Sequence, residues 1–456
     1  MRVDFHYLLS SEEFECLDFH DLTALGPEER QTVARALRKP LALLLDNVDY
    51  QHHQAPADTK LRQDLLDWLK ENGIMAMFPG KEQRLQFIID CSAESSEYYY
   101  PLPLWKHDTR LVMAIVTALY VLSDDDAVLN PDERKSLASF SFNHFQHLTE
   151  NSQLCIAIGK ALAMVVDHFG SQDPLVGSRC GQSFTGFFDS CAEEERLEHE
   201  LPIHLSHGHH KRPHSSSQRC SAEEFPTHLR VSTGSALLYV APIFKKGRTD
   251  EVPYMFWIST IPDMCYFINN VNDLLSFPKE VIAGETWNYM SMTTRTKRQA
   301  GRQSMFKSKH GTLWTYRDTL CETLSGLRQR SIALDEAFTS CVLFEGQKGQ
   351  HDLKGESQKA AQLWNAFKHG FICWHLNCYR YGLQNLPFEK FTSSQKPTGE
   401  RELEPSLGFL SALSSRFSRL ILLLFLTIVL FSIGLLNFYW SPFHLADCGV
   451  LAVDGI

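Results

Sequence analysis

Three oxygen-bearing side chains follow one another at four-residue intervals in the stretch VNDLLSFPKE, residues 271–280: the amide of Asn272, the hydroxyl of Ser276 and the carboxylate of Glu280. On an α-helix such positions stay within about 80° of one another, so the three side chains would converge on one volume beside the helix. Oxygen donors without sulfur or imidazole are the ligands that a hard cation such as Mg²⁺ prefers. The spacing alone also fits a polar helix face in water, so other residues must decide between the two interpretations.

A second group of carboxylates, Asp124, Asp125 and Asp126, follows Ser123 at the end of an apolar helical pattern. Adjacent carboxylates repel one another, so such clusters are normally solvated at a helix end or neutralised by bound cations. Acidic clusters at helix ends are common. This one therefore indicates a metal site only in combination with the first group.

Basic and phenolic donors occur in three further places. Arg230 lies in FPTHLRVSTG and is followed four residues later by Gly234, Lys279 lies inside the first group, and Arg380 and Tyr381 adjoin near the end of a predicted helix. Guanidinium and ammonium groups form charge-assisted hydrogen bonds with phosphate oxygens. Together with two oxygen-rich clusters they predict a site for a diphosphate held by several Mg²⁺ ions, with apolar helices leaving a pocket for an isoprenoid tail.

These stretches resemble the fungal trichodiene synthase family of class I terpene cyclases. The resemblance covers roughly residues 100–385, and its most specific patterns are NDxxSxxKE and HGxxxWHLxxxRY. The matching strings occur in the family's order: GFFDSC, FPTHLR with Gly234, NDLLSFPKE and AFKHGFICWHLNCYRYGL. The resemblance implies an all-α class I terpenoid-synthase helical bundle, with the active site in its central cavity and a linear prenyl diphosphate as substrate. The substrate expected first is farnesyl diphosphate, with fifteen carbons.

The family's functional residues carry over by position. Three Mg²⁺ ions are expected, one of them held by Asn272, Ser276 and Glu280 and two by the aspartate cluster Asp124, Asp125 and Asp126. Arg230, Lys279, Arg380 and Tyr381 would hold the diphosphate. Gly234 would mark a helix break near the allylic carbon. Ionisation of the diphosphate would then leave an allylic carbocation, which cyclises in a cavity closed to water.

Two local features depart from the family pattern. The aspartate cluster continues with Ala127 and Val128 where the family has an acid, so Asp124 and Asp125 remain alternatives for the bridging ligand. Pro278 removes a backbone hydrogen bond inside the first group and predicts a kink between Ser276 and Glu280. Such a kink would either re-aim the glutamate usefully or spoil the site.

Three alternatives to a sesquiterpene cyclase therefore stay open. The enzyme could act on a substrate of ten or twenty carbons, it could join two prenyl chains, or the protein could be a catalytically inactive, membrane-tethered binder of prenyl diphosphates. A nucleic-acid-binding protein is not expected, because the net charge of the 456 residues is −10. The family's tendency to dimerise suggests a homodimer.

The C-terminal part predicts a membrane anchor over residues 419–440. The run from Leu420 to Leu436 carries no charge, Arg416 and Arg419 precede it, and Tyr439 and Trp440 follow. About 20 apolar residues span a bilayer core, and flanking arginines favour the cytosolic side. We therefore expect a single-pass anchor with the catalytic domain in the cytosol, at the endoplasmic reticulum membrane.

The elements that must position these groups are helices. Residues 1–390 read as one α-helical cyclase domain with polar inserts near 190–222, 294–312 and 344–358, followed by a linker over 391–418, the anchor, and a tail over 441–456. The basic insert, with six Lys and Arg between Arg295 and Lys309, fits a solvated loop or a contact with an anionic surface. Twelve cysteines without paired spacing indicate reduced thiols.

Overall fold

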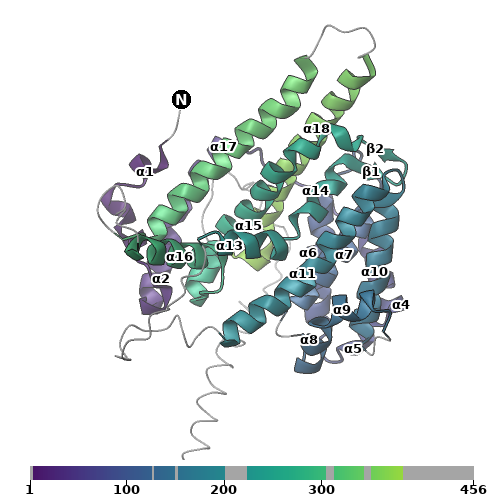
Figure 1. Cartoon of the computed structure of the whole chain (residues 1–456), viewed down its shortest axis with the longest axis horizontal. Coiled ribbons are helices and arrows are strands. Elements are labelled where there is room, and N and C mark those ends of the chain that lie inside the picture. Colours follow the sequence, from purple (N-terminus) through teal and green to yellow (C-terminus); the bar gives the residue numbers. More distant parts are fainter. Residues whose placement is uncertain are drawn as a thin grey trace, which may run out of the picture. The chain divides into compact units, whose positions relative to one another are not determined.

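Helices make up almost all of the regular structure in the described part of the chain (Figure 1). The structure is a computed structural model and describes residues 4–125, 128–148, 152–200, 223–303, 313–343 and 351–383. All of them belong to one structural unit, Met1–Gln395. The predicted linker, anchor and tail, as well as Asp126, lie outside the described residues.

The N-terminal half consists of α-helices with two short 3₁₀ helices. Its elements are α1 (Phe5–Leu8), η1 (Glu12–Leu17), η2 (Leu22–Ala24), α2 (Pro27–Ala36), α3 (Arg38–Asn47), α4 (Thr59–Glu71), α5 (Ile74–Met77), α6 (Glu82–Tyr99), α7 (His107–Ser123), α8 (Pro131–Leu137), α9 (Phe140–Phe145), α10 (Gln153–Gly170) and α11 (Pro174–Glu200).

The second half continues with long helices and one small hairpin. Its elements are α13 (Phe225–Thr233), α14 (Ala236–Phe244), β1 (Lys245–Gly247), β2 (Asp250–Glu251), η3 (Tyr254–Phe256), η4 (Ile258–Thr260), α15 (Ile261–Ala283), α16 (Tyr289–Gln303), α17 (Tyr316–Leu343), α18 (His351–Asn377) and η5 (Tyr379–Tyr381). The two strands pair in antiparallel fashion.

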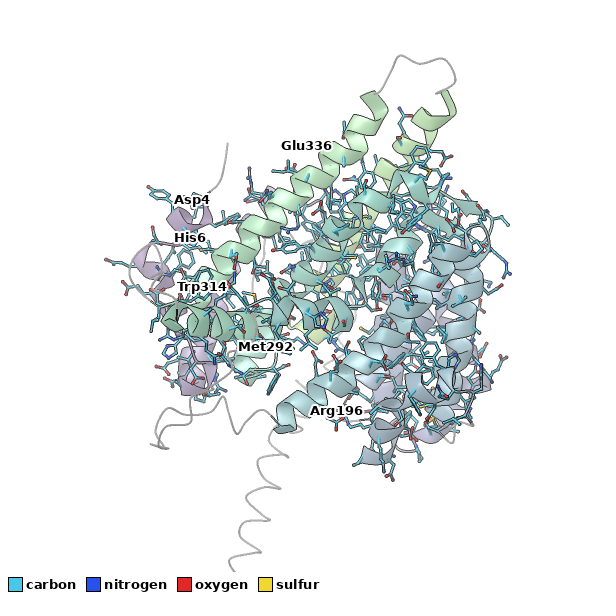
Figure 2. All side chains as sticks on the ribbon, in the orientation of Figure 1. Asp4, His6, Arg196, Met292, Trp314 and Glu336 are labelled. Atoms are coloured by element: carbon cyan, nitrogen blue, oxygen red, sulfur yellow. The ribbon has the colours of Figure 1, made fainter. Side chains whose placement is uncertain are left out.

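Local sequence explains where these helices begin and which face they bury. Asp58 caps α4, because its side chain accepts a hydrogen bond from the backbone N–H of Leu61, and Leu61, Leu65 and Leu69 then bury one stripe at four-residue spacing. α7 is apolar on all sides and is buried along most of its length. α17 is amphipathic: Glu336 projects from its exposed face (Figure 2), whereas Leu334 and Phe338 are buried.

The helices pack around a common core. α7 contacts α6 and α10, α18 contacts α6 and α17, and α15 contacts α14 and α17. Gly370 explains how closely α18 approaches α6, since a Cβ atom at this position would lie 1.8 Å from the carbonyl oxygen of Tyr98. No other residue fits there without moving one helix, which gives the glycine of the HGxxxWHL pattern a packing role.

Helices begin earlier or end later than the polar inserts predicted. α11 continues to Glu200, so residues 190–200 are helical and not part of a loop. Cys191 and Glu194 are partly buried on this last stretch, so the helix keeps an inward face where the sequence seemed purely polar. α16 likewise continues to Gln303, and α18 begins at His351. Residues 201–222, 304–312 and 344–350 are outside the described residues.

Among the described helices, α10 is long and apolar enough to cross a membrane, with a mean hydropathy of 1.3. Half of it is buried inside the structure, where it packs against α11 and α7. These contacts are those of a core helix.

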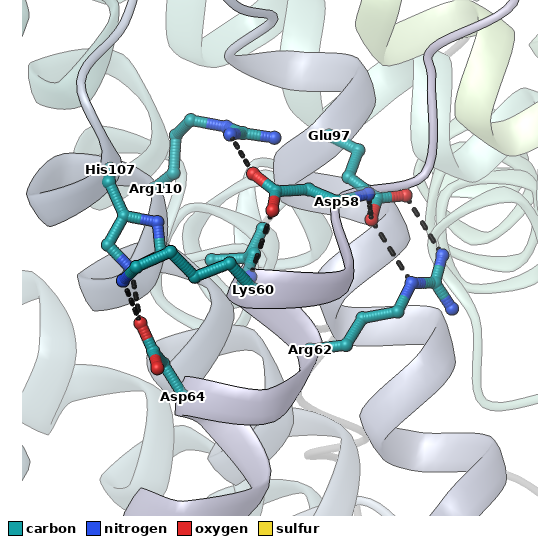
Figure 3. A network of polar contacts seen from close by, with 8 residues as sticks. Asp58, Lys60, Arg62, Asp64, Glu97, His107 and Arg110 are labelled. Atoms are coloured by element: carbon teal, nitrogen blue, oxygen red, sulfur yellow. Dashed lines mark hydrogen bonds and ion pairs between the residues drawn. The ribbon is translucent and has the colours of Figure 1, made fainter.

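A network of ion pairs fastens the start of α4 to α6 and α7 (Figure 3). Arg110 of α7, only 2% exposed, donates to Asp58 at 2.5 Å. Arg62 donates two hydrogen bonds to Glu97, at 3.1 and 2.9 Å. Removing one member of a buried pair leaves the other charge unpaired, at a cost of about 3–5 kcal/mol. The network thus fixes the beginning of α7, the helix that leads to the aspartate cluster.

Stability should depend on pH through His168 of α10. This side chain is 4% exposed, its Nε2 lies 2.8 Å from the Thr109 hydroxyl, and burial lowers its pKa to about 4. Because the unfolded chain takes up the proton first, the contribution of His168 to stability is complete above the ordinary pKa and is lost as the pH falls toward 4. We expect the free energy of unfolding to fall by about 2 kcal/mol less in His168→Gln than in the wild type between pH 7 and pH 4.5. Urea denaturation at both pH values measures the difference, and parallel pH profiles would contradict it.

Candidate functional site

One cavity of about 190 Å³ lies between helices from both halves of the chain. It is lined by Tyr99, Thr117, Tyr120, Val121, Asp124, Phe187, Arg230, Gly234, Tyr239, Ile268, Asn269, Asn272, Phe371, Trp374, His375, Arg380 and Tyr381. Aromatic rings form much of this wall: the ring of Tyr99 has its centre 4.9 Å from that of Phe371 and 5.4 Å from that of Trp374. The cavity therefore combines an aromatic wall with a small set of charged and polar groups.

The first oxygen-bearing group lies on α15, as the spacing predicted. α15 runs without interruption from Ile261 to Ala283, so Pro278 does not end it. Ser276 and Glu280 are 4% and 9% exposed, and burial raises the pKa of Glu280 against the opposing effects of Lys279 and Ser276. Both residues are therefore buried on one continuous helix, before and after the proline.

Asn272 is the member of this group that lines the cavity. Its Oδ1 accepts a hydrogen bond from Nη2 of Arg230 at 2.9 Å. Arg230 also donates from Nε to Asp273, with the nearer carboxylate oxygen at 2.8 Å. The guanidinium is therefore held by α15 on two sides, directly beside an oxygen that was predicted to bind metal.

The aspartate cluster splits in the structure. Asp124 lines the cavity, is 58% exposed and pairs with Nη2 of Arg380 at 2.7 Å. Asp125 is buried, does not line the cavity, and pairs with Nε of Arg84 at 2.5 Å. Of the two alternatives for the bridging ligand, the structure brings only Asp124 to the other site residues; Asp126 is outside the described residues.

The predicted diphosphate-binding residues lie near one another. Arg230, Arg380 and Tyr381 line the cavity. Lys279 does not line it, but its Nζ lies 5.6 Å from the centre of the Tyr381 ring. The Tyr381 hydroxyl accepts a hydrogen bond from Nδ2 of Asn272 at 3.1 Å. Each of the five charged or polar residues Asp124, Arg230, Asn272, Arg380 and Tyr381 thus contacts a second member of the set.

The helix break predicted at Gly234 lies between α13 and α14. α13 ends at Thr233, and Ser235 takes a left-handed conformation with φ 44° before α14 begins at Ala236. Gly234 lies against α15: a Cβ atom there would be 2.0 Å from Oδ1 of Asn269 and 2.8 Å from the carbonyl oxygen of Arg230.

Gly234→Ala is expected to lower the free energy of unfolding by about 1–3 kcal/mol, because the added methyl group would clash with the buried Asn269 amide and with the Arg230 carbonyl. The matched control is Gly186→Ala on α11, where an added Cβ would meet no atom within 4 Å. There the better helix propensity of alanine should raise stability, by up to about 1 kcal/mol. Denaturation of both variants in urea tests the contrast, and equal values would refute the close approach.

Three acidic residues beside the cavity were not predicted. Burial and then Asp124 raise the pKa of Glu194 to about 7, while burial and then Glu280 raise the pKa of Glu285 to about 7. Burial also raises the pKa of Asp273, against the opposing effect of Arg230. Asp273 adjoins Asn272 in the sequence and could have been noticed there. Glu194 carries no local signal, because only the fold brings α11 to Asp124.

The donor chemistry fits divalent cations. All four predicted ligands, Asn272, Ser276, Glu280 and Asp124, can offer a metal ion an oxygen atom. In this structure Arg230 binds Asn272 and Arg380 binds Asp124. A metal-bound diphosphate would attract both arginines away from these oxygens. Within the described residues, no cluster of three His, Cys, Asp or Glu side chains is suited to a metal. A metal here would be held by the carboxylates of Glu280 and Asp124 together with the Asn272 amide, the Ser276 hydroxyl and the diphosphate itself.

The sequence is similar to those of several fungal proteins. Terpene synthase 29 of Postia placenta is 28% identical over 282 residues, which are 61% of this chain and 66% of that protein. Terpene synthase BipA of Cochliobolus sativus is 26% identical over 334 residues, 73% of this chain and 85% of that protein. The (E)-beta farnesene synthase of Metarhizium brunneum is 25% identical over 264 residues, 58% of this chain and 72% of that protein. No family model matches the chain.

Solved structures of bacterial synthases overlap with most of the chain at low identity. Linalool/nerolidol synthase from Streptomyces clavuligerus, in complex with 2-fluorogeranyl diphosphate, has a TM-score of 0.49 and 14% identity, covering 72% of this chain and 98% of its own. Germacradien-4-ol synthase from Streptomyces citricolor has a TM-score of 0.47 and 14% identity, covering 71% of this chain and 97% of its own. The similarity to terpene synthases that the sequence predicted is found in the fungal sequences described above. Membership of the trichodiene synthase family in particular stays a prediction.

Proposed function

We propose that the chain is a class I terpene cyclase of the trichodiene synthase type, which converts farnesyl diphosphate to a cyclic C15 terpene and releases diphosphate. One observation carries the proposal: a single cavity with an aromatic wall gathers Asp124, Arg230, Asn272, Arg380 and Tyr381 from four separate segments. The sequence similarity to fungal terpene synthases supports the reaction class.

The oxygen-bearing residues would bind the metal ions, and the basic residues with Tyr381 would bind the diphosphate. Asn272, Ser276, Glu280 and Asp124 would hold Mg²⁺, which when bound neutralises the diphosphate and makes it a better leaving group. Arg230 would exchange the Asn272 amide, and Arg380 the Asp124 carboxylate, for phosphate oxygens. The hydroxyl of Tyr381 would donate a hydrogen bond to the diphosphate.

The aromatic wall suits the hydrocarbon part of the substrate. Once the carbon–oxygen bond breaks, the electron pair leaves with the diphosphate and an allylic cation remains in the cavity. The faces of Tyr99, Phe371 and Trp374 can stabilise this positive charge through their quadrupoles. With the hydrocarbon chain in place, these rings would also exclude water that would quench the cation.

The test is an incubation of the full chain with geranyl, farnesyl and geranylgeranyl diphosphate, with Mg²⁺ or with excess chelator, followed by gas chromatography–mass spectrometry. We expect a cyclic C15 hydrocarbon or alcohol from the C15 substrate, and none after chelation. A cyclic C10 or C20 product would replace the substrate assignment. A folded protein that gives no product from any of the three would make an inactive binder the better interpretation.

We further propose that residues 419–440 anchor the enzyme in the endoplasmic reticulum membrane, with the catalytic unit in the cytosol as a homodimer. The uncharged run after Arg419 supports the anchor. A fluorescent protein fused to residues 411–456 should appear on that membrane, and a diffuse cytosolic signal would rule the anchor out.

A further inference from the structure

His375 has a fixed tautomer in the structure. It lies on α18, is completely buried, and its Nδ1 is 2.7 Å from the carbonyl oxygen of Phe371 one helical turn earlier. A carbonyl oxygen only accepts hydrogen bonds, so Nδ1 must carry the proton. In the neutral ring Nε2 is then left with a lone pair and can act only as an acceptor.

This acceptor faces the amide of Asn272, which lies 103 residues earlier on α15. Nδ2 of Asn272 is 3.1 Å from Nε2 of His375 and 3.1 Å from the Tyr381 hydroxyl, so both of its N–H groups have acceptors. A flipped amide would place Oδ1 against the lone pair of Nε2, which is repulsive. The Oδ1 atom consequently points the other way, where Nη2 of Arg230 lies at 2.9 Å.

We propose that His375 is a positioning residue, which orients the Asn272 amide so that its oxygen faces the site of cations and diphosphate. An asparagine amide has two nearly isosteric ends, and only the oxygen end can bind a metal ion. Without an acceptor at His375, the amide would turn its NH₂ group toward the cation for part of the time. The inference rests on the proposed function, because it needs a cation at Asn272.

Packing is the competing explanation, since His375 also lies against aromatic rings, with its ring centre 4.6 Å from that of Tyr381. Three substitutions separate the two roles. His375→Phe keeps a ring but loses both hydrogen bonds. His375→Asn can reach the Phe371 carbonyl but not Asn272. His375→Gln can place an amide oxygen near the position of Nε2, and so restores the acceptor without a ring.

The experiment titrates Mg²⁺ into the full chain with inorganic diphosphate and follows the melting temperature. We expect His375→Phe and His375→Asn to need about 10-fold more Mg²⁺ for half of the full shift, and His375→Gln to stay within about 3-fold of the wild type. If His375→Gln is as impaired as His375→Phe, or if all variants match the wild type, the positioning role is overturned. A wild-type protein with no Mg²⁺-dependent shift would instead refute the proposed function.

A double substitution gives a second, independent test of the positioning role of His375. In Asn272→Asp the side chain ends in two equivalent oxygens, so there is no amide left to orient. His375→Phe should then leave the Mg²⁺ requirement unchanged or lower it, because it also removes the repulsion between the new carboxylate oxygen and Nε2, in contrast to its effect in the wild-type background. An equal factor in both backgrounds would show that His375 acts through packing alone.

Discussion

Glu280→Gln is expected to lower the rate of product formation by about 10³-fold while stabilising the protein without metal. The carboxylate is 9% exposed and burial raises its pKa, against the opposing effects of Lys279 and Ser276, and nearby Asp273 adds repulsion. A neutral amide of the same shape removes that cost, so the free energy of unfolding should rise by about 1 kcal/mol. The same change removes the only carboxylate in the α15 group of metal ligands, worth several kcal/mol in the transition state.

Two measurements test whether Glu280→Gln loses activity while it gains stability. Product rates at saturating Mg²⁺ give the loss of activity, and urea denaturation with chelator gives the stability. Because the pKa of Glu280 is raised in the folded state, the wild type gains stability as the pH falls and the carboxylate is protonated. The advantage of Glu280→Gln should therefore shrink at low pH. A variant that is less stable than the wild type at pH 8 would contradict the account of Glu280 as a buried charge that its neighbours compensate only in part.

The most accurate predictions from the sequence concerned features that lie within a single helix. Asn272, Ser276 and Glu280 lie at four-residue intervals on α15, so their relation follows from helical geometry, and Pro278 does not end the helix. The long apolar pattern of α7 likewise predicted a buried helix ending at the aspartates. In both cases the period of the helix carries the information.

Tertiary contacts decided the rest. Asp124 and Asp125 are neighbours of the same type, but Asp125 pairs with Arg84, 41 residues earlier on α6, and only Asp124 is left for the cavity. His375 belonged to a specific string, yet its role appears only when α18 meets α15. Such pairings depend on how helices turn toward one another, which local residue types do not determine.

Arg230→Met removes the guanidinium that contacts both Asp273 and Asn272. Arg230 pairs with Asp273 and bonds to Asn272, and its loss would leave the Asp273 carboxylate buried and unpaired. We expect the free energy of unfolding to fall by about 3 kcal/mol and the rate of product formation to fall by about 10³-fold. The double variant Arg230→Met with Asp273→Asn should regain most of the stability, since no charge is left unpaired, but none of the activity. Equal loss of stability in the single and double variants would contradict this.

The matched control is Arg248→Met. Arg248 also pairs with an aspartate, Asp167, but the two side chains are 56% and 60% exposed. An exposed pair contributes about 0–1 kcal/mol, so this variant should keep nearly full stability and full activity. The comparison separates the loss of a positive charge as such from the loss of the partner of a buried carboxylate. Arg230 is 17% exposed and its guanidinium is shared between the buried Asp273 carboxylate and an oxygen of the α15 group. Only in Arg230→Met should stability and catalysis fall together, with the stability alone recovered by Asp273→Asn.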